Sequence, residues 1–237
     1  MPTPPNRPDL DLLSSLVVRK ALDCVVLPAF RRASGLSVRT EYLPTTILLE
    51  KLDAGAAPDV VIGTREALQD LEASGLLAGG RAVPLVSSAI GLGVAPGAEP
   101  PSIATESDLV DALLSARSVA FSRAGQSGIF FQELLSRLGI AEKVLARATA
   151  LESGFTATAL TDGRADLALQ QVSELLFVDG IETVVPLPEE FQQHTDFSVA
   201  LGPGAVGKSA AQTLVDHLTG GPARDAYAAT GLQNISA

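Results

Sequence analysis

Short apolar runs alternate with amphipathic segments along the first third of the chain. Extended patterns at 10–13, 37–43 and 58–63 are separated by segments with helical spacing, the first of which ends at Gly35. That first segment has one predicted apolar face: Val18, Ala21, Leu22, Val25 and Ala29. Strands that are apolar along their length and joined by helices indicate a parallel sheet covered on both faces.

The same alternation begins again in the middle of the chain. Extended patterns at 88–97 and 117–122 flank a helical segment at 107–116, and two more follow at 165–174 and 181–188. A second α/β unit is the simplest arrangement that accounts for this repetition. The remaining C-terminal residues form one extended pattern and two helical stretches, too short for a third domain: 195–202, 206–219 and 222–230.

Composition excludes several classes of function. The net charge is −10, with 17 basic and 27 acidic residues, and the basic residues are scattered singly, so we expect no nucleic acid partner. No run of about 18 apolar residues occurs, so we expect no membrane insertion. His194 and His217 lie far apart, and the single cysteine, Cys24, falls on an apolar face. We therefore expect no metal site and no disulfide, and a core position for Cys24.

The N-terminal stretch "MPTPPNRPDLDLLSS" has prolines where a secretion signal would have a continuous apolar segment. The chain as written is therefore expected to be cytoplasmic, or periplasmic if a leader has been removed from it.

Three polar turns precede predicted helices. They contain Ser14 and Ser15, the segment Pro44–Thr46, and the segment Ser122–Gly128. Hydroxyl groups at a helix N-terminus cap the helix or help to hold an anion, because unpaired N–H groups and a partial positive charge lie there. Ligands of α/β sheets bind at the carboxyl ends of the strands, so the turns would converge on one cleft if the two units face each other.

Arg123, in the third turn, has two interpretations. It is either a bidentate donor to a carboxylate or oxyanion, or a solvated surface residue. The glycine spacing in "GLGVAPG" does not match a dinucleotide fingerprint, and no Gly-Lys-Ser/Thr loop occurs. We therefore expect no cofactor.

Several blocks, in their order along the chain, resemble the substrate-binding proteins of molybdate-type transporters, a branch of the type II periplasmic binding proteins. They are "LDAGAAPDVVIGT", "LEASGLL", "FSRAGQSGIFFQELLSRLGI", "TDGRADLALQQVSELL", "VVPLPEEFQ" and "LTGGPARDAYAATGL". The resemblance implies an α/β fold with two three-layer lobes around a central ligand cleft. One lobe would comprise residues 1–84 plus 196–237, and the other residues 85–195.

The resemblance also implies anion contacts by position. Pro44 stands where the family has a glycine, and Gln171 where molybdate binders have a tyrosine. Together with Arg123, these departures favour a carboxylate over a tetrahedral oxoanion. Strand alternation predicts that only one of Gln170 and Gln171 faces the cleft. The predicted ligand-binding residues are Ser14, Ser15, Thr45, Thr46, Ser122, Arg123, Gln126, Ser127, Phe155, Gln171 and Ser173.

"LQQVSELL" and "PLPEEFQ" also resemble a divergent sub-branch of the family that includes aconitate isomerase. Such an isomerase needs groups that remove and return a proton, for which Glu174, Glu152, His194 and a serine are candidates. Each of the three named residues is more simply explained as an ordinary helix or surface residue.

Two hypotheses of different classes follow. The first is a protein that binds a di- or tricarboxylate or an oxoanion, with an ABC transporter permease as partner if it is exported. The second is an isomerase that shifts a proton on a small tricarboxylate. A molybdate or tungstate receptor is a third interpretation, and whether the chain is an enzyme stays open.

Overall fold

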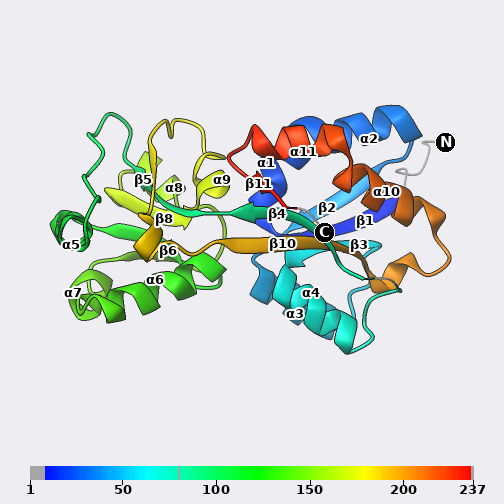
Figure 1. Cartoon of the computed structure of the whole chain (residues 1–237), viewed down its shortest axis with the longest axis horizontal. Coiled ribbons are helices and arrows are strands. Elements are labelled where there is room, and N and C mark those ends of the chain that lie inside the picture. The colour runs from blue at the N-terminus through cyan, green and yellow to red at the C-terminus, as the bar shows by residue number, and fades with distance from the viewer. Residues whose placement is uncertain (1–8, 80, 236–237) are drawn as a thin grey trace, which may run out of the picture.

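The computed structural model describes residues 9–79 and 81–235 and forms two lobes, each built around its own β-sheet (Figure 1). The first lobe holds a six-stranded sheet in the order β11-β4-β10-β3-β1-β2, and the second a five-stranded sheet in the order β7-β6-β8-β5-β9. The strands of the first sheet are β1 (Leu10–Ser14), β2 (Val38–Tyr42), β3 (Val60–Thr64), β4 (Val83–Ser88), β10 (Thr195–Leu201) and β11 (Gln233–Asn234). Those of the second are β5 (Ile90–Val94), β6 (Val119–Ser122), β7 (Thr149–Leu151), β8 (Leu167–Gln171) and β9 (Val184–Pro186).

Helices cover both faces of each sheet, which confirms the predicted three-layer lobes. One face of the first sheet packs against η1 (Leu16–Val18), α1 (Arg19–Ala21), η2 (Leu22–Val26), α2 (Leu27–Ser34), α10 (Ser209–Thr219) and α11 (Gly221–Ala228). The other face packs against α3 (Thr45–Asp53) and α4 (Arg65–Ala73). The second sheet lies between α5 (Glu106–Ser115), α6 (Gln126–Arg137) and α7 (Ala141–Leu145) on one side and α8 (Thr158–Thr161) and α9 (Val172–Leu175) on the other.

Strand direction differs from the prediction where the chain passes between the lobes. β1 pairs in parallel with β2 and β3, and β6 with β7 and β8. β10 runs antiparallel to β3 and β4, and β5 runs antiparallel to β8 and β9. The prediction of wholly parallel sheets is therefore wrong for these strands. They are the strands next to the two crossings, so each enters its sheet from the direction of the other lobe (Figure 1).

The predicted lobe boundaries at residues 84 and 195 stay a prediction. Among the strands, the last residue of the first sheet before the second lobe is Ser88, at the end of β4. The chain rejoins the first sheet at Thr195, where β10 begins. The first eight residues of the predicted lobe lie outside the described part of the chain.

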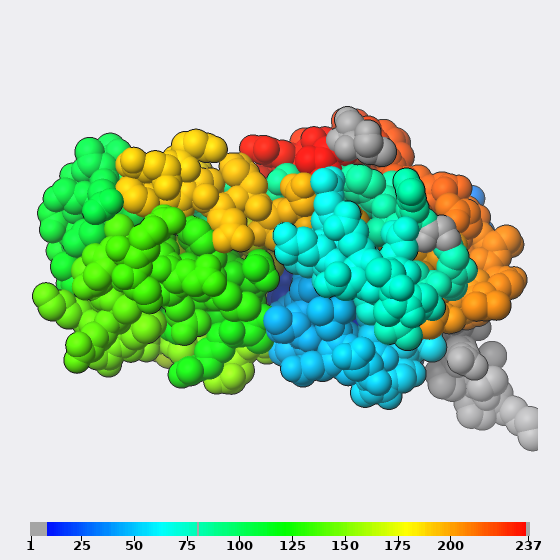
Figure 2. Space-filling model, turned by 60° about the horizontal axis from the view of Figure 1, so that its bottom comes forward, coloured from blue at the N-terminus to red at the C-terminus, as the bar shows by residue number. Residues whose placement is uncertain are grey.

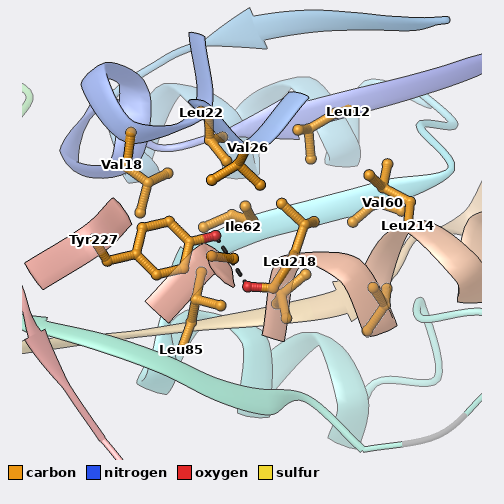
Figure 3. Close-up of a cluster of buried hydrophobic side chains, with 14 of the residues drawn as sticks. Leu12, Val18, Leu22, Val26, Val60, Ile62, Leu85, Leu214, Leu218 and Tyr227 are labelled. Carbon is orange, nitrogen blue, oxygen red and sulfur yellow. Dashed lines mark hydrogen bonds between the residues drawn. The ribbon is translucent and has the colours of Figure 1, made fainter. Parts of the chain in front are cut away.

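The first helical segment departs from its predicted face at the π-helical turn η2. A π turn is wider than an α turn by one residue, so the apolar face is displaced along the sequence. Leu22 and Val26 are buried beside Tyr227, whose hydroxyl donates to the Leu218 carbonyl at 3.1 Å (Figure 3). Val25 is 47% exposed, and Cys24 is exposed as well. The expectation of core positions for Val25 and Cys24 is therefore wrong.

Candidate functional site

A small cavity of about 30 Å³ lies between the lobes, where strands end and helices begin. Figure 2 is viewed toward this gap. Part of the N-terminal segment (dark blue) is visible deep in the gap, between the second lobe (green) and the first lobe (light blue). Both lobes contribute to its wall. The lining residues are Ser15, Leu16, Pro44, Thr45, Ser122, Gly125, Gln126, Ser127, Gly154, Gln170, Gln171, Glu174 and Phe197.

The junction after β1 separates the two serines of the first polar turn. Ser14 Oγ donates to the Ser15 carbonyl at 2.9 Å, and Ser14 does not line the cavity. The Ser15 amide donates to the Ile62 carbonyl at 2.8 Å, which fixes its backbone against β3. Ser15 Oγ lines the cavity, and no protein group hydrogen-bonds to it although the residue is only 3% exposed.

The junction between β6 and α6 supplies the opposite wall. Ser122 Oγ is also buried without a hydrogen-bond partner, in a residue that is 2% exposed. A Cβ at Gly128 would lie 1.6 Å from the Ser122 carbonyl oxygen, so only glycine lets the helix start approach the strand end this closely. Gly125 is the N-cap and offers no side chain to the first turn. Gln126 and Ser127 thus line the cavity at the positive end of α6.

Two predicted ligand contacts join the lobes instead of lining the cavity. Thr46 Oγ1 donates to the Ala124 carbonyl at 2.7 Å, whereas its neighbour Thr45 lines the cavity. Ser173 Oγ donates to the Val17 carbonyl at 3.0 Å. Both hydroxyls already have partners in the other lobe, so they hold the two walls together.

Both glutamines at the end of β8 line the cavity, which corrects the expectation that only one of them faces it. Strand alternation stops at Gln171, because this residue is also the N-cap of α9. Gln170 Oε1 accepts from the Thr156 amide at 2.7 Å and from Thr156 Oγ1 at 2.9 Å, and its Nε2 donates to the Gly154 carbonyl at 3.0 Å. The prediction left Gln170 out of the ligand-binding set because the family resemblance placed a contact at Gln171 and strand alternation allowed only one glutamine to face the cleft.

Gln171 ties the cavity to the strands that connect the lobes. In the amide orientation that satisfies both of its ends, its nitrogen donates to the Ser88 carbonyl at 3.2 Å and to Ser88 Oγ at 3.1 Å. Its oxygen accepts from Thr195 Oγ1 at 3.0 Å. Ser88 ends β4 and Thr195 begins β10, so Gln171 is anchored where the chain crosses between lobes.

The structure does not bring Arg123 into the cavity. Its side chain is 60% exposed, and its Nε lies 3.1 Å from Glu152 Oε1. Phe155 also lies outside the lining, stacked on Phe177 with ring centroids 4.3 Å apart, while its neighbour Gly154 lines the cavity.

Glu174 is the one titratable side chain among the described residues that line the cavity. It lies in α9 and is 8% exposed. Burial raises the pKa of its carboxyl to about 8, and hydrogen bonds from the Gln170 side chain and the Gln171 backbone oppose that rise only in part. Sequence reasoning named Glu174 as a proton carrier and not as a lining residue. The signal available for both was an acidic residue three positions after an apolar strand, in the first turn of a helix.

The other two proton-carrier candidates lie outside the cavity lining. Glu152 is exposed, and His194 Nε2 lies 4.0 Å from Glu189 Oε2 with 39% of its side chain exposed. Within the described residues, no group of three or more His, Cys, Asp or Glu side chains could hold a metal ion. No described helix is both long enough and apolar enough to cross a bilayer.

A family model described as bacterial extracellular solute-binding protein matches residues 10–233. The chain belongs to this family. It is 29% identical over 218 residues to aconitate isomerase from a Pseudomonas species, an alignment that covers 90% of this chain and 83% of that protein.

Solved structures of other proteins have the same fold as this chain. The periplasmic molybdate-binding protein of Azotobacter vinelandii is similar with a TM-score of 0.78 at 15% identity, over 96% of this chain and 100% of that one. The tungstate ABC transporter structure from Geobacter sulfurreducens is similar with a TM-score of 0.66 at 19% identity, over 93% of this chain and 97% of that one. These likenesses confirm the predicted two-lobed fold of type II periplasmic binding proteins.

Proposed function

We propose that this solute-binding protein holds a small anion, a di- or tricarboxylate or an oxoanion, in the cavity between its lobes. The observation that carries the proposal is the pair of buried hydroxyls, Ser15 Oγ and Ser122 Oγ, which line the cavity from opposite lobes without a protein partner. Buried hydroxyls are normally hydrogen-bonded, and two orphans in one cavity are accounted for by a ligand that accepts from both.

The electrostatics of the cavity support an anion held by neutral donors. No lysine, arginine or histidine is among its described lining residues. The N-terminus of α6, where Gln126 and Ser127 lie, carries a partial positive charge. It lies next to Ser122, the last residue of β6. The likeness to aconitate isomerase favours a carboxylate among the possible anions.

The cavity must widen to admit such a ligand. Its volume is about 30 Å³, whereas ligand pockets for small molecules hold roughly 300–1,000 Å³. The hydrogen bonds of Thr46 and Ser173 cross the gap, so widening requires the lobes to separate and these bonds to break. We therefore propose that the described conformation is the closed one.

A thermal-shift screen tests the proposal. We expect one or more of molybdate, tungstate, sulfate, phosphate, citrate, cis-aconitate and trans-aconitate to raise the melting temperature, because a ligand that binds only the folded state stabilises it. Glycerol and sodium chloride at matched concentrations serve as controls. No shift with any of these anions at about 10 mM, roughly 10-fold above a Kd of 1 mM, would contradict anion binding.

Replacing Arg123 by alanine is expected to change the affinity for a carboxylate by less than about fivefold, because an exposed ion pair contributes about 0–1 kcal/mol. This differs from the sequence interpretation of Arg123 as a ligand donor, since its side chain is turned to Glu152. Calorimetry on the variant and the wild-type protein measures the difference. A loss of 100-fold or more, on the order of 3 kcal/mol, would return Arg123 to the site.

A second candidate function is proton-shift isomerisation of a small tricarboxylate. It is favoured by Glu174, a buried carboxyl that lines the cavity, together with the likeness to aconitate isomerase. In such a reaction a base removes a proton from the carbon next to a carboxylate, and the proton is returned at the other end of the three-carbon unit. We expect Glu174 to carry that proton.

Proton NMR in deuterated water distinguishes the two functions. An isomerase converts cis-aconitate into trans-aconitate and introduces deuterium, and Glu174→Gln abolishes both changes. A protein that only binds leaves the spectrum of the ligand unchanged over days.

We infer that the protein acts outside the cytoplasm, because its family is described as extracellular. This supports the periplasmic alternative over the cytoplasmic location expected from the N-terminal sequence. An ABC transporter permease is then the proposed partner that receives the anion.

A further inference from the structure

Glu174 lies in the cavity without a counter-ion. The elements that pack most extensively against its helix α9 are β5, β8, β9 and η1, and none of them contains a titratable side chain. The basic side chains in neighbouring described segments are engaged elsewhere. Lys20 Nζ donates to the Leu176 carbonyl at 2.6 Å, Arg19 pairs with Asp23 at 3.3 Å, and Arg123 pairs with Glu152.

An ionised Glu174 would oppose the function proposed for this cavity. A buried carboxylate without a cation loses its hydration and gains no compensating ion pair. It would also repel an anion bound beside Ser15 and Ser122, with little screening in a closed site. The neutral acid has neither cost, and it adds an O–H donor to a cavity whose other polar lining residues carry hydroxyl and amide groups.

We propose that Glu174 takes part in ligand binding as a neutral carboxylic acid that donates a hydrogen bond to the anion, so that the anion and one proton are bound together. This inference rests on the proposed binding of an anion in the same cavity. It goes beyond that function because it assigns the specificity of the site to a residue that must be protonated.

The surroundings of Glu174 leave its hydroxyl free for this role. Donors of the Gln170 side chain and the Gln171 backbone lie beside the carboxyl and lower its pKa only in part. Gln170 is itself fixed by Thr156 and by the Gly154 carbonyl. Glu174 lines the cavity, so the O–H of the neutral acid is within reach of a ligand there, and the described lining residues include no other ionisable group.

The ligand class follows from this donor. A neutral acid binds best to oxygen atoms that carry no proton of their own, such as those of ionised carboxylates and of sulfate. The pH dependence follows as well. The carboxyl is mostly protonated at neutral pH and ionises as the pH rises through about 8, so the affinity is expected to fall only on the alkaline side.

Calorimetric titration between pH 6 and pH 9.5 tests the proposal, with trans-aconitate and sulfate as probes. Sulfate stays fully ionised over that range, and trans-aconitate does so from about pH 7 upwards, because its two neighbouring carboxylates raise the pKa of the third carboxyl. We expect the affinity of the wild-type protein to be constant up to about pH 7 and to fall by up to about tenfold per pH unit above pH 8. Titrations at pH 9 in buffers of different ionisation enthalpy are expected to show the uptake of about one proton per bound anion.

Two variants separate Glu174 from other groups. Glu174→Gln keeps an N–H donor of similar shape, so its affinity is expected to be independent of pH up to 9.5. Glu152→Gln is the matched control, because Glu152 is 85% exposed and lies outside the cavity lining, and its pH profile is expected to follow that of the wild-type protein.

Each outcome decides the matter. Binding with the same affinity from pH 6 to pH 9.5, or an alkaline loss that persists in Glu174→Gln, overturns this proposal and leaves anion binding intact. If neither probe binds at pH 6, and no anion in the thermal-shift screen binds, both the proposed function and this inference are overturned.

Stability measurements on the unliganded protein check the fold of Glu174→Gln and the protonation of Glu174 independently. The pKa of Glu174 is higher in the folded state than in the unfolded chain, so its stabilising contribution is complete at acidic pH and is lost as the pH rises to about 8. The wild-type melting temperature is therefore expected to fall relative to that of Glu174→Gln between about pH 5 and pH 8. If the difference between the two melting temperatures is constant over that range, Glu174 is not a neutral acid in the folded protein.

Discussion

Replacing Ser15 and Ser122 together by alanine is expected to weaken anion binding by about 100- to 10,000-fold, since each hydrogen bond to a charged group contributes about 1.5–3 kcal/mol. The same double variant is expected to be at least as stable as the wild-type protein when no ligand is present. Both hydroxyls are buried without partners in the described structure, so their removal deletes no protein hydrogen bond. Calorimetry measures the first effect, and thermal unfolding measures the second.

The opposite signs of these two effects identify a binding role. A serine retained for folding would lower the stability of the free protein when it is removed. Ser118→Ala is the matched control, because Ser118 lies just before the same strand as Ser122 and its Oγ is 2.8 Å from Thr149 Oγ1. We expect it to cost about 1 kcal/mol of stability and to leave binding unchanged. Equal affinities of the double variant and the wild-type protein would contradict the proposed site.

Replacing Gly128 by alanine is expected to cause the largest loss of stability of the single substitutions considered, more than about 3 kcal/mol. The added Cβ would stand 1.6 Å from the Ser122 carbonyl oxygen, which is backbone and cannot rotate away. The start of α6 must then move from the end of β6, so Ser122 and Ser127 no longer line one cavity. Anion binding is expected to be lost together with stability.

Gly221→Ala is the control for this substitution. Gly221 also lies in the first turn of a helix, α11, but a Cβ there would meet nothing within 4 Å. Its conformation does not require glycine either, so alanine is expected to leave the melting temperature unchanged or slightly raised. If Gly128→Ala has the same melting temperature as the wild-type protein, α6 can be displaced without loss of stability, which would contradict this prediction.

The sequence predicted the cavity through local signals. Ser15 and Ser122 each follow an apolar strand and precede a helical pattern, and a strand end that meets a helix start is encoded within a few residues. For the same reason Ser127, Thr45 and Gln126 line the cavity as the turns suggested.

The sequence could not show which of two neighbouring hydroxyl residues lines the cavity. Ser14 and Thr46 lie in the same turns as Ser15 and Thr45, but their hydroxyls are taken by the Ser15 and Ala124 carbonyls. The partner of Thr46 is 78 positions away, in the other lobe. Only the packing of the two lobes determines which hydroxyl is left without a protein partner.

Side chains whose environment is set at a distance were the hardest to predict. Arg123 pairs with Glu152, which follows β7, the strand that pairs with β6, and no local pattern encodes that contact. The π turn η2 exposes Cys24 because it displaces the helical face, and spacing arguments assume a regular α-helix. Gln170 entered the cavity because β8 ends one residue later.

In the proposed site, selectivity comes from neutral donors. Ser15, Ser122 and the start of α6 would supply hydrogen bonds to the anion, and Glu174 would add one only while it is protonated. Such a site discriminates between ligands by the positions and protonation of their oxygen atoms more than by their total charge.

The most direct test is a crystal structure of the protein with the anion that gives the largest thermal shift. We expect electron density for that anion between the lobes, with oxygen atoms within about 3.2 Å of Ser15 Oγ and Ser122 Oγ. Density for the anion at another surface, with the space between these two hydroxyls filled by water or by protein, would contradict it.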